Sequence, residues 1–344
     1  MDKIHHENKK FSDEPIISVV MPSYNHENYI DYAINSVTSQ GIKNLELIIV
    51  DDFSSDNSQR IIRRWTEEDN RIKAIFHSKN EGIARTINDG IKAARGKYIA
   101  LMASDDMFKQ GAFEKVIAVL ESSEDLGVAM IEGECIDNKN RRMGVLFSEL
   151  YRKPSTERGN FFKDLAIGNF VCTGVVRRSI IEKYQIFYCE ELKYLNDWLF
   201  WLDLSNVCDF AFISEPLYYY RIHGANTSLS YNNMMVYDGL KAIDMVLSKY
   251  GKILDNKSKD RLLRWKGRSY IVLHNYKRAR EHFYMCLHLN SSLLNNSKTT
   301  LYILFTYFPR LFGYHMGLLG RLKKQTYKEK KILEKILHVS WASR

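Results

Sequence analysis

Leu45-Glu-Leu-Ile-Ile-Val-Asp-Asp-Phe-Ser-Ser-Asp56 joins a short apolar run to a cluster of polar side chains. The run 45–50 is rich in branched apolar residues, which is typical of a buried strand. The polar residues 51–56 follow the carboxyl end of that strand, where ligands bind in parallel α/β sheets. This stretch therefore predicts a strand of an α/β fold and one part of a ligand site.

The segments around this stretch alternate between strand and helix. Strands are predicted at 16–21, 45–50, 73–77, 98–102, 128–131, 210–213 and 217–222. Apolar residues at helical spacing predict helices at 27–40, 58–67, 82–94, 111–122 and 178–184. Strands separated by helices of about ten residues indicate a sheet built by right-handed crossovers. We therefore expect an α/β fold with a mostly parallel sheet flanked by helices.

Two further polar clusters follow predicted strands. Pro22-Ser-Tyr-Asn25 comes after the first strand and Ser104-Asp-Asp106 after the fourth. Because the carboxyl ends of parallel strands meet at one edge of the sheet, these clusters and residues 51–56 are expected to form one site.

Adjacent carboxylates at a strand end repel each other unless a cation lies between them. Asp105 and Asp106 therefore predict a Mg²⁺ or Mn²⁺ site, since these ions prefer oxygen ligands and bridge to substrate phosphates. The alternative is a solvated turn in which an aspartate caps the helix that starts near Phe113.

The other polar side chains at this edge are suited to a nucleotide. Asp52 is able to accept hydrogen bonds from a base or a ribose, and Tyr24 offers a ring face for stacking. Arg85, which follows Asn80 in a loop that enters a helix, is placed to pair with a diphosphate. The alternatives are helix capping by residues 54–56, packing of the tyrosine ring and a surface salt bridge of the arginine.

Two segments further along the chain carry candidate catalytic groups. In Asn196-Asp-Trp198, apolar neighbours are expected to raise the pKa of the Asp197 carboxyl, as a general base requires. The aromatic ring beside it suits a sugar face, and the alternative is a helix N-cap by residue 196 or 197. His223 is a candidate metal ligand, although a lone histidine is also compatible with a structural role.

The last third of the chain is helical and basic. Residues 231–344 carry 22 Lys and Arg against 7 Asp and Glu, a net charge of +15, whereas residues 1–230 carry −6. The apolar run 301–308 is far shorter than the roughly 18 residues of a spanning helix, and a lysine-rich segment follows it. This pattern predicts a peripheral anchor on an anionic membrane. A helix that docks on the catalytic domain is the alternative, and no module typical of nucleic-acid binding is recognisable.

The five cysteines form no CxxC pair, and residues 1–14 have no apolar core of their own. We expect a disordered tail at 1–14, no signal peptide and a cytoplasmic protein, peripheral at the inner face of the plasma membrane.

Across residues 15–228 the chain resembles glycosyltransferase family 2, inverting enzymes with the GT-A fold. The resemblance rests on the order and spacing of several short motifs rather than on any one of them. The motifs are Ser18-Val-Val-Met-Pro-Ser-Tyr-Asn25, Val50-Asp-Asp-Phe-Ser-Ser-Asp56, Asn80-x-Gly82, Asn88-x-Gly90, Gly96-Lys-Tyr-Ile99, Ser104-Asp-Asp106, Asn196-Asp-Trp198 and Tyr220-Arg-x-His223.

The resemblance implies a role for each matching residue. Tyr24 and Asp52 would hold the base, Asp105 the ribose, Asp106 a Mn²⁺ or Mg²⁺ ion, and His223 that ion or the diphosphate. Asp197 would deprotonate the acceptor hydroxyl. The implied donor-binding set also includes Pro22, Asn25, Asn80 and Arg85, and the implied acceptor-side residues are Asn196 and Trp198. Ala103 and Asn196 depart from the acidic residues that many relatives carry at these positions, so the base rests on residue 197 alone.

These observations predict an inverting glycosyltransferase with a catalytic domain at 15–230 and a helical region at 231–344. Its donor is expected to be a nucleotide sugar, with a UDP-sugar as the first candidate. Its acceptor is expected to be a glycan or lipid-linked glycan of cell-surface polysaccharide, O-antigen, capsule or glycoprotein synthesis. The competing classes are a nucleotidyltransferase, which would normally show a Gly-rich phosphate loop after the first strand, and a non-catalytic nucleotide- or lipid-binding protein.

Overall fold

The computed structural model describes residues 14–151, 153–167, 173–224, 226, 233–289 and 293–307. The predicted disordered tail at 1–14, apart from Glu14, and the lysine-rich segment after 308 lie outside the described residues.

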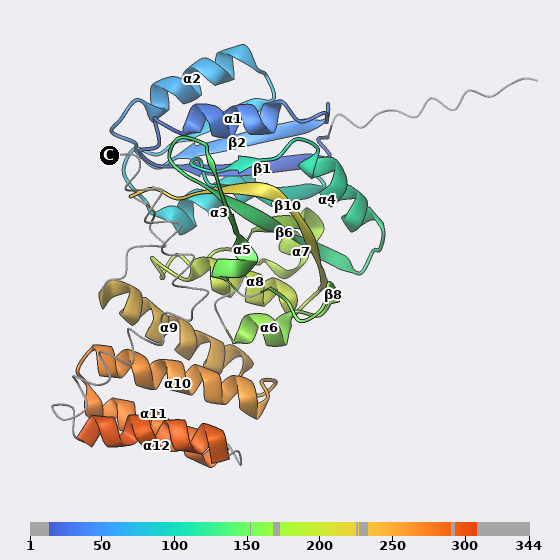
Figure 1. Cartoon of the computed structure of the whole chain (residues 1–344). Coiled ribbons are helices and arrows are strands. Elements are labelled where there is room, and N and C mark those ends of the chain that lie inside the picture. The colour runs from blue at the N-terminus through green and yellow to red at the C-terminus, as the bar shows by residue number, and fades with distance from the viewer. Residues whose placement is uncertain are drawn as a thin grey trace, which may run out of the picture.

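One mixed sheet forms the centre of the protein (Figure 1). Its order is β3-β2-β1-β4-β9-β6-β10-β5, with β7 paired to β6 and β8 to β10. The strands are β1 (Ile17–Ser23), β2 (Leu45–Asp51), β3 (Ile72–Phe76), β4 (Tyr98–Leu101), β5 (Met107–Phe108), β6 (Leu126–Ile136), β7 (Arg142–Leu146), β8 (Arg158–Gly159), β9 (Gly174–Arg177) and β10 (Asp209–Arg221). The α/β fold class is confirmed.

The first four strands pair in parallel, as predicted from the alternation of strand and helix. The second half of the sheet differs, because β9 is inserted antiparallel between β4 and β6. Sequence analysis missed this four-residue strand, and also β5, β7 and β8, which are short or lie in polar segments. The segments predicted at 210–213 and 217–222 are one strand, β10, with an irregular register around Pro216. Proline has no N–H to give to a ladder, which explains the irregularity.

Helices flank the sheet, with α1 and α2 on one side and α8 on the other (Figure 1). Within the sheet region the helices are α1 (Ile30–Thr38), α2 (Ser58–Glu68), α3 (Ile83–Ala93), α4 (Ala112–Glu121), α5 (Phe147–Leu150), α6 (Phe162–Ala166), α7 (Arg178–Tyr184) and α8 (Asn196–Ser205). Helix α1 buries Ile30, Ala33, Ile34 and Val37, which recur at helical spacing. This pattern explains why the helix lies flat on the sheet.

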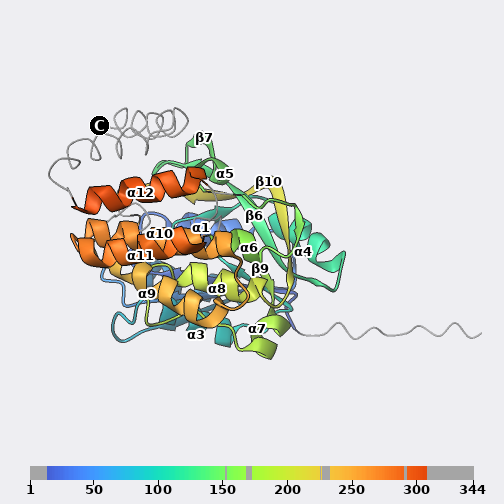
Figure 2. The ribbon, with the colours of Figure 1, turned by 90° about the horizontal axis from the view of Figure 1, so that it is seen from below.

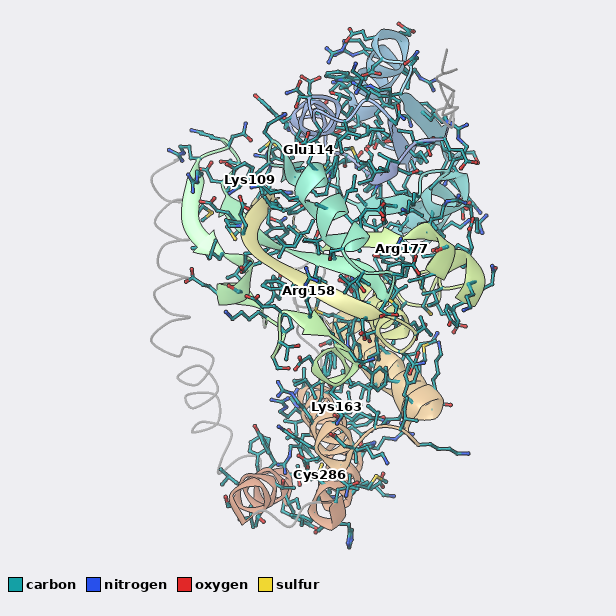
Figure 3. All side chains as sticks on the ribbon, turned by 90° about the vertical axis from the view of Figure 1, so that its right-hand side faces the viewer. Lys109, Glu114, Arg158, Lys163, Arg177 and Cys286 are labelled. Atoms are coloured by element: carbon teal, nitrogen blue, oxygen red, sulfur yellow. The ribbon has the colours of Figure 1, made fainter. Side chains whose placement is uncertain are left out.

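The C-terminal helices stack on the α8 side of the sheet in chain order (Figures 1 and 2). They are α9 (Asn233–Tyr250), α10 (Asn256–Val272), α11 (Tyr276–Leu289) and α12 (Leu293–Tyr307). Ile243 of α9 and Leu262 of α10 belong to the same apolar core as the sheet. A second cluster centred on Phe283 fills the outer helices, where Cys286 is also buried (Figure 3).

In α12, Ile303 and Phe305 of the predicted apolar run are buried. Ile303 packs in the Phe283 cluster with residues of α9, α10 and α11, so this part of the run is buried within the helical region itself. In the described part of the chain, no helix combines the length and hydropathy needed to cross a membrane.

Candidate functional site

The loops after β1 and β2 are hydrogen-bonded to each other at the carboxyl ends of these strands, the edge of the sheet predicted to carry the site. Asp52 N donates to the Ser23 carbonyl at 2.8 Å, and Asn25 N donates to Ser54 Oγ at 2.9 Å. Ser55 N in turn donates to Asn25 Oδ1 at 2.8 Å. Two of the predicted polar clusters therefore form one rigid edge, as their position after adjacent strands indicated.

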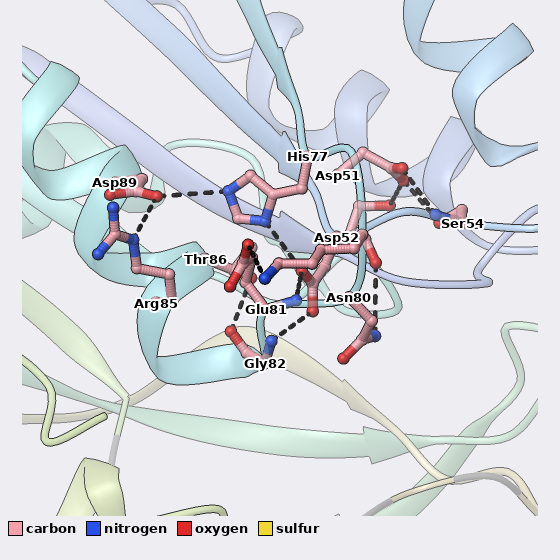
Figure 4. Close-up of polar contacts among 12 residues, drawn as sticks. Asp51, Asp52, Ser54, His77, Asn80, Glu81, Gly82, Arg85, Thr86 and Asp89 are labelled. Carbon is pink, nitrogen blue, oxygen red and sulfur yellow. Dashed lines mark hydrogen bonds and ion pairs between the residues drawn. The ribbon is translucent and has the colours of Figure 1, made fainter. Parts of the chain in front are cut away.

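The Asp52 carboxylate is buried at this edge and accepts three hydrogen bonds (Figure 4). Its donors are Glu81 N at 2.7 Å, Gly82 N at 2.9 Å and His77 Nδ1 at 2.9 Å. Asn80 Nδ2 donates to the Asp52 carbonyl at 3.4 Å. The loop before α3 therefore holds the carboxylate in one orientation. A hydrogen-bond acceptor that recognises a nucleobase needs such a fixed orientation.

The neighbouring aspartates act on the local turn. Asp51 accepts from Ser54 N and from Gln59 Nε2, both at 2.9 Å, and Asp56 accepts from Ser58 N at 2.9 Å. These contacts stabilise the turn before α2, whose N-cap is Asn57 and not one of residues 54–56. Asp52 is instead directed to the next loop (Figure 4).

The other predicted donor-binding residues at the edge differ in exposure. Pro22 is buried within β1 opposite Val50, whereas the Tyr24 side chain is 47% exposed. Asn25 has a left-handed backbone with φ of 54°. Tyr24 therefore presents a free ring at the edge, and the other two residues shape the loop that carries it.

Arg85 pairs with carboxylates of the protein. Its Nε donates to Asp89 Oδ2 at 2.9 Å, and Asp89 Oδ2 also lies 3.4 Å from His77 Nε2 (Figure 4). The surface salt bridge that the sequence left open is therefore the observed arrangement. His77 was missed because nothing in a strand-ending histidine indicates that it bridges two carboxylates.

Asp105 and Asp106 lie in different surroundings although they are adjacent in sequence. Asp106 Oδ2 accepts from the Tyr218 hydroxyl and Oδ1 from Arg221 N, both at 2.8 Å. Burial, and next the charge of Asp105, raise the pKa of Asp106 well above its ordinary value. Both oxygens of the residue predicted to bind metal are therefore engaged by β10.

Asp105 instead forms a group with His223 and His26. Asp105 Oδ2 lies 2.9 Å from His223 Nε2 and 3.9 Å from His26 Nε2. Potential ligand atoms of the three residues all lie within 4.8 Å of one another. Burial tends to raise the pKa of Asp105, but the His223 hydrogen bond and the nearby imidazoles lower it overall. Sequence analysis missed His26, although it directly follows the first polar cluster.

The three residues fit a divalent cation. A carboxylate suits Mn²⁺ or Mg²⁺, and two imidazoles favour Mn²⁺ over the harder Mg²⁺. His26 Nδ1 lies 2.8 Å from Ser104 Oγ, a contact that orients the ring and leaves Nε2 directed at Asp105. Within the described residues this is the group whose atoms converge as metal ligands do.

Asp197 lies in the first turn of α8, and burial raises the pKa of its carboxyl, as the apolar context predicted. The cap residue of α8 is Leu195, so neither residue 196 nor residue 197 caps the helix through its side chain. Asn196 Nδ2 donates to the Leu192 carbonyl at 3.2 Å. Asp197 Oδ1 accepts from Trp198 N at 2.7 Å, so the contacts of both residues are local to the start of α8.

Trp198 is placed differently from the acceptor-side prediction. Its side chain is 3% exposed, and Nε1 donates to the Leu165 carbonyl at 2.7 Å. Its ring packs against Trp265 of α10, with ring centroids 5.4 Å apart. Because adjacent residues on a helix face different directions, this ring joins the helical layers and does not offer a face to a sugar.

Comparison with known proteins places these features in a family. Residues 18–185 match the family model for glycosyl transferase family 2. An uncharacterized glycosyltransferase of Nostoc is 33% identical over 231 residues, which are 62% of this chain and 67% of the relative. Chondroitin synthase of Escherichia coli is 29% identical over 69% of this chain, and the match spans 33% of that longer protein.

Solved structures support the same fold. S. aureus TarS 1–349 in complex with UDP-GlcNAc superimposes with a TM-score of 0.65 at 18% identity, covering 88% of this chain and 92% of TarS 1–349. The mannosyltransferase PcManGT of Pyrobaculum calidifontis, in complex with GDP-Man and Mn²⁺, gives a TM-score of 0.53 at 12% identity, covering 96% of this chain and 88% of that one.

Proposed function

The chain belongs to glycosyl transferase family 2, and on that premise we propose that it is an inverting glycosyltransferase that uses a UDP-sugar. Its acceptor would be a glycan or lipid-linked glycan of cell-surface polysaccharide synthesis. The observation that carries this proposal is the convergence of His26, Asp105 and His223 at the sheet edge that also holds Asp52 and Tyr24.

The donor nucleotide would lie along this edge. The fixed carboxylate of Asp52 accepts a hydrogen bond from the imide N–H of a uracil, and the exposed Tyr24 ring offers a stacking face. TarS, which shares the fold, has been solved with UDP-GlcNAc, and this supports a UDP-sugar here. Arg85, which pairs with Asp89, is left out of the proposed diphosphate contacts.

We assign the metal to His26, Asp105 and His223 in place of Asp106, because the ligand atoms of these three residues converge. A bound Mn²⁺ would neutralise charge on the diphosphate of the departing nucleotide. Asp106 would act indirectly, because its hydrogen bonds to Tyr218 and Arg221 hold the turn from which Asp105 projects. Arg221 supports the same turn, since its Nε donates to the Asp105 carbonyl at 2.6 Å.

Asp197 would accept the proton of the acceptor hydroxyl as its oxygen attacks the anomeric carbon. The new glycosidic bond forms as the bond from that carbon to the diphosphate oxygen breaks, so the configuration inverts and the nucleoside diphosphate leaves with the bonding electrons. The raised pKa of the Asp197 carboxyl suits a group that must take up a proton.

We propose that residues 15–230 form the catalytic unit and that residues 231–344 serve it as an accessory helical region at an anionic membrane surface. The net charge of +15 in residues 231–344 supports the second part. Such a surface would bring the enzyme to a lipid-linked acceptor on the cytoplasmic side of the plasma membrane.

A panel of UDP-, GDP- and dTDP-sugars, tested with Mn²⁺, Mg²⁺ or EDTA, examines this function through release of nucleoside diphosphate. We expect turnover with a UDP-sugar, higher with Mn²⁺ than with Mg²⁺, and none in EDTA. Absence of turnover with every donor, or full activity in EDTA, would contradict the proposal.

Variants of the two histidines test the metal assignment directly. His26→Ala and His223→Ala should each weaken Mn²⁺ binding in the presence of UDP at least tenfold, about the loss seen when a metal site is perturbed. His288→Ala, at an exposed histidine of α11, is the matched control. Calorimetry measures Mn²⁺ affinity independently of turnover. Unchanged affinity in both site variants would show that the ion binds elsewhere.

A further inference from the structure

Phe53 combines a bulky side chain with a backbone that rarely carries one. Its φ is +65°, in the left-handed region, and its side chain is 52% exposed. For a residue with a large side chain this conformation is an outlier, costs free energy, and persists only where the surrounding structure imposes it. A glycine would adopt the same backbone without that cost.

Both neighbours of Phe53 are held in place. On one side, Asp52 N is bonded to the Ser23 carbonyl, and the Asp52 carboxylate is bonded to the loop before α3. On the other side, Ser54 N and Oγ both donate to the Asp51 carboxylate, at 2.9 and 2.6 Å. These contacts fix the turn, and Phe53 stays about half exposed within it.

Packing does not account for the phenylalanine. Phe53 belongs to none of the apolar clusters of the described residues, and about half of its surface faces solvent. A residue that is strained, apolar and exposed at the edge of a ligand site is explained more simply by contact with the ligand.

The position of Phe53 in the fold indicates which part of the ligand it meets. Ser23 and Asp51 pair across β1 and β2, and the loops that follow are joined by the Asn25–Ser54 and Ser55–Asn25 hydrogen bonds. Phe53 therefore lies next to Asp52, in a loop that is hydrogen-bonded to the loop that carries the exposed Tyr24. Apolar ring faces beside a fixed hydrogen-bond acceptor are what a nucleobase requires.

We propose that Phe53 is a second aromatic contact for the nucleobase, and that the strained turn exists to present it. This inference rests on the proposed function, because it assigns a subsite of the same donor site. It predicts that the ring contributes to binding of the base and not to binding of the diphosphate.

The test compares Phe53→Gly with Phe53→Tyr in the full chain, with UDP or inorganic pyrophosphate as the probe and Mn²⁺ present. Stacking on an aromatic ring contributes enough that Phe53→Gly should weaken UDP binding about tenfold. Pyrophosphate affinity should stay within twofold of wild type. Phe53→Tyr keeps the ring and should retain UDP affinity within about twofold.

The melting temperature without ligand separates this role from a structural one. Glycine relieves the positive φ, so Phe53→Gly should melt no lower than the wild type, whereas a packing role would lower its melting temperature. Gln185→Gly is the matched control, because this residue is also left-handed, with φ of 52°, and lies at the end of α7, outside the β1–β2 edge. It should leave UDP affinity unchanged.

The possible failures are distinct. Wild-type affinity for UDP in Phe53→Gly, or equal losses for UDP and pyrophosphate, would overturn the role of Phe53 and leave the proposed function standing. A wild-type protein that binds no nucleoside diphosphate would overturn both.

Discussion

Asp197 is a carboxyl whose surroundings favour the protonated form, since burial raises its pKa. Asp197→Asn keeps the shape of the side chain and removes its basicity. We expect single-turnover sugar transfer to fall by about two to four orders of magnitude, the usual contribution of a general base, with donor affinity nearly unchanged. Asn196→Ala should cost far less, because that side chain bonds only a local carbonyl. Near wild-type transfer by Asp197→Asn would place the base elsewhere.

The raised pKa of Asp197 also predicts how sugar transfer and protein stability change with pH. Transfer should decline as pH falls through the pKa of Asp197, because the protonated carboxyl accepts no proton. The free energy of unfolding changes in the opposite direction. Because the pKa of Asp197 is raised in the folded state, this group stabilises the fold at low pH, and that contribution is lost as pH rises through the raised pKa. Melting temperatures of wild type and Asp197→Asn, measured from acid to neutral pH, should therefore converge at low pH and favour the variant at neutral pH.

At the scale of elements, Gly96 lies where the chain entering β4 passes close to β1. A Cβ added at Gly96, just before β4, would lie 2.6 Å from the backbone nitrogen of Ser18 in β1. Backbone atoms of a paired strand have little room to move, so Gly96→Ala should lower the free energy of unfolding by about 1–3 kcal/mol.

Gly239 in α9 is the matched control for this prediction. A Cβ there meets its nearest atom at 3.6 Å, and alanine is favoured over glycine inside a helix. Gly239→Ala should therefore raise the free energy of unfolding by up to about 1 kcal/mol. Chemical denaturation measures both variants, and equal effects of the two would contradict the close approach of β1 and β4.

At the scale of the whole molecule, the C-terminal region has parts with different roles. Removal of residues 308–344 keeps α12 with its buried Ile303, so the shortened protein should fold and release nucleoside diphosphate from the donor as before. It should lose salt-sensitive binding to vesicles containing anionic lipid, which charge attraction drives and salt screens. Sedimentation with vesicles at low and high salt measures this, and retained binding would contradict the membrane role.

Removal of residues 231–344 is the contrasting truncation. It would take Ile243 and Leu262 out of the apolar core and leave Trp198 without its partner Trp265. We expect this shorter chain to be insoluble or unstable, because the sheet region and α9–α10 share one core.

The sequence alone determined the parallel half of the sheet and the edge that carries the site. Alternating apolar runs and helical spacing specify β1 to β4 and the helices between them, and polar residues after adjacent parallel strands necessarily lie at one edge. The apolar neighbours of Asp197 likewise indicated its raised pKa. These features follow from local sequence, because periodicity and strand ends are local properties.

Only the tertiary structure decided which side chains meet at that edge. The sequence shows Asp105-Asp106 as two equivalent carboxylates, but β10 engages Asp106 and brings His223 to Asp105. His26 joins them from the loop after β1, and Trp198 packs against Trp265 of α10. These residues are separated by tens of positions along the chain, so their contacts depend on strand order and on the direction of each side chain, which local patterns do not encode.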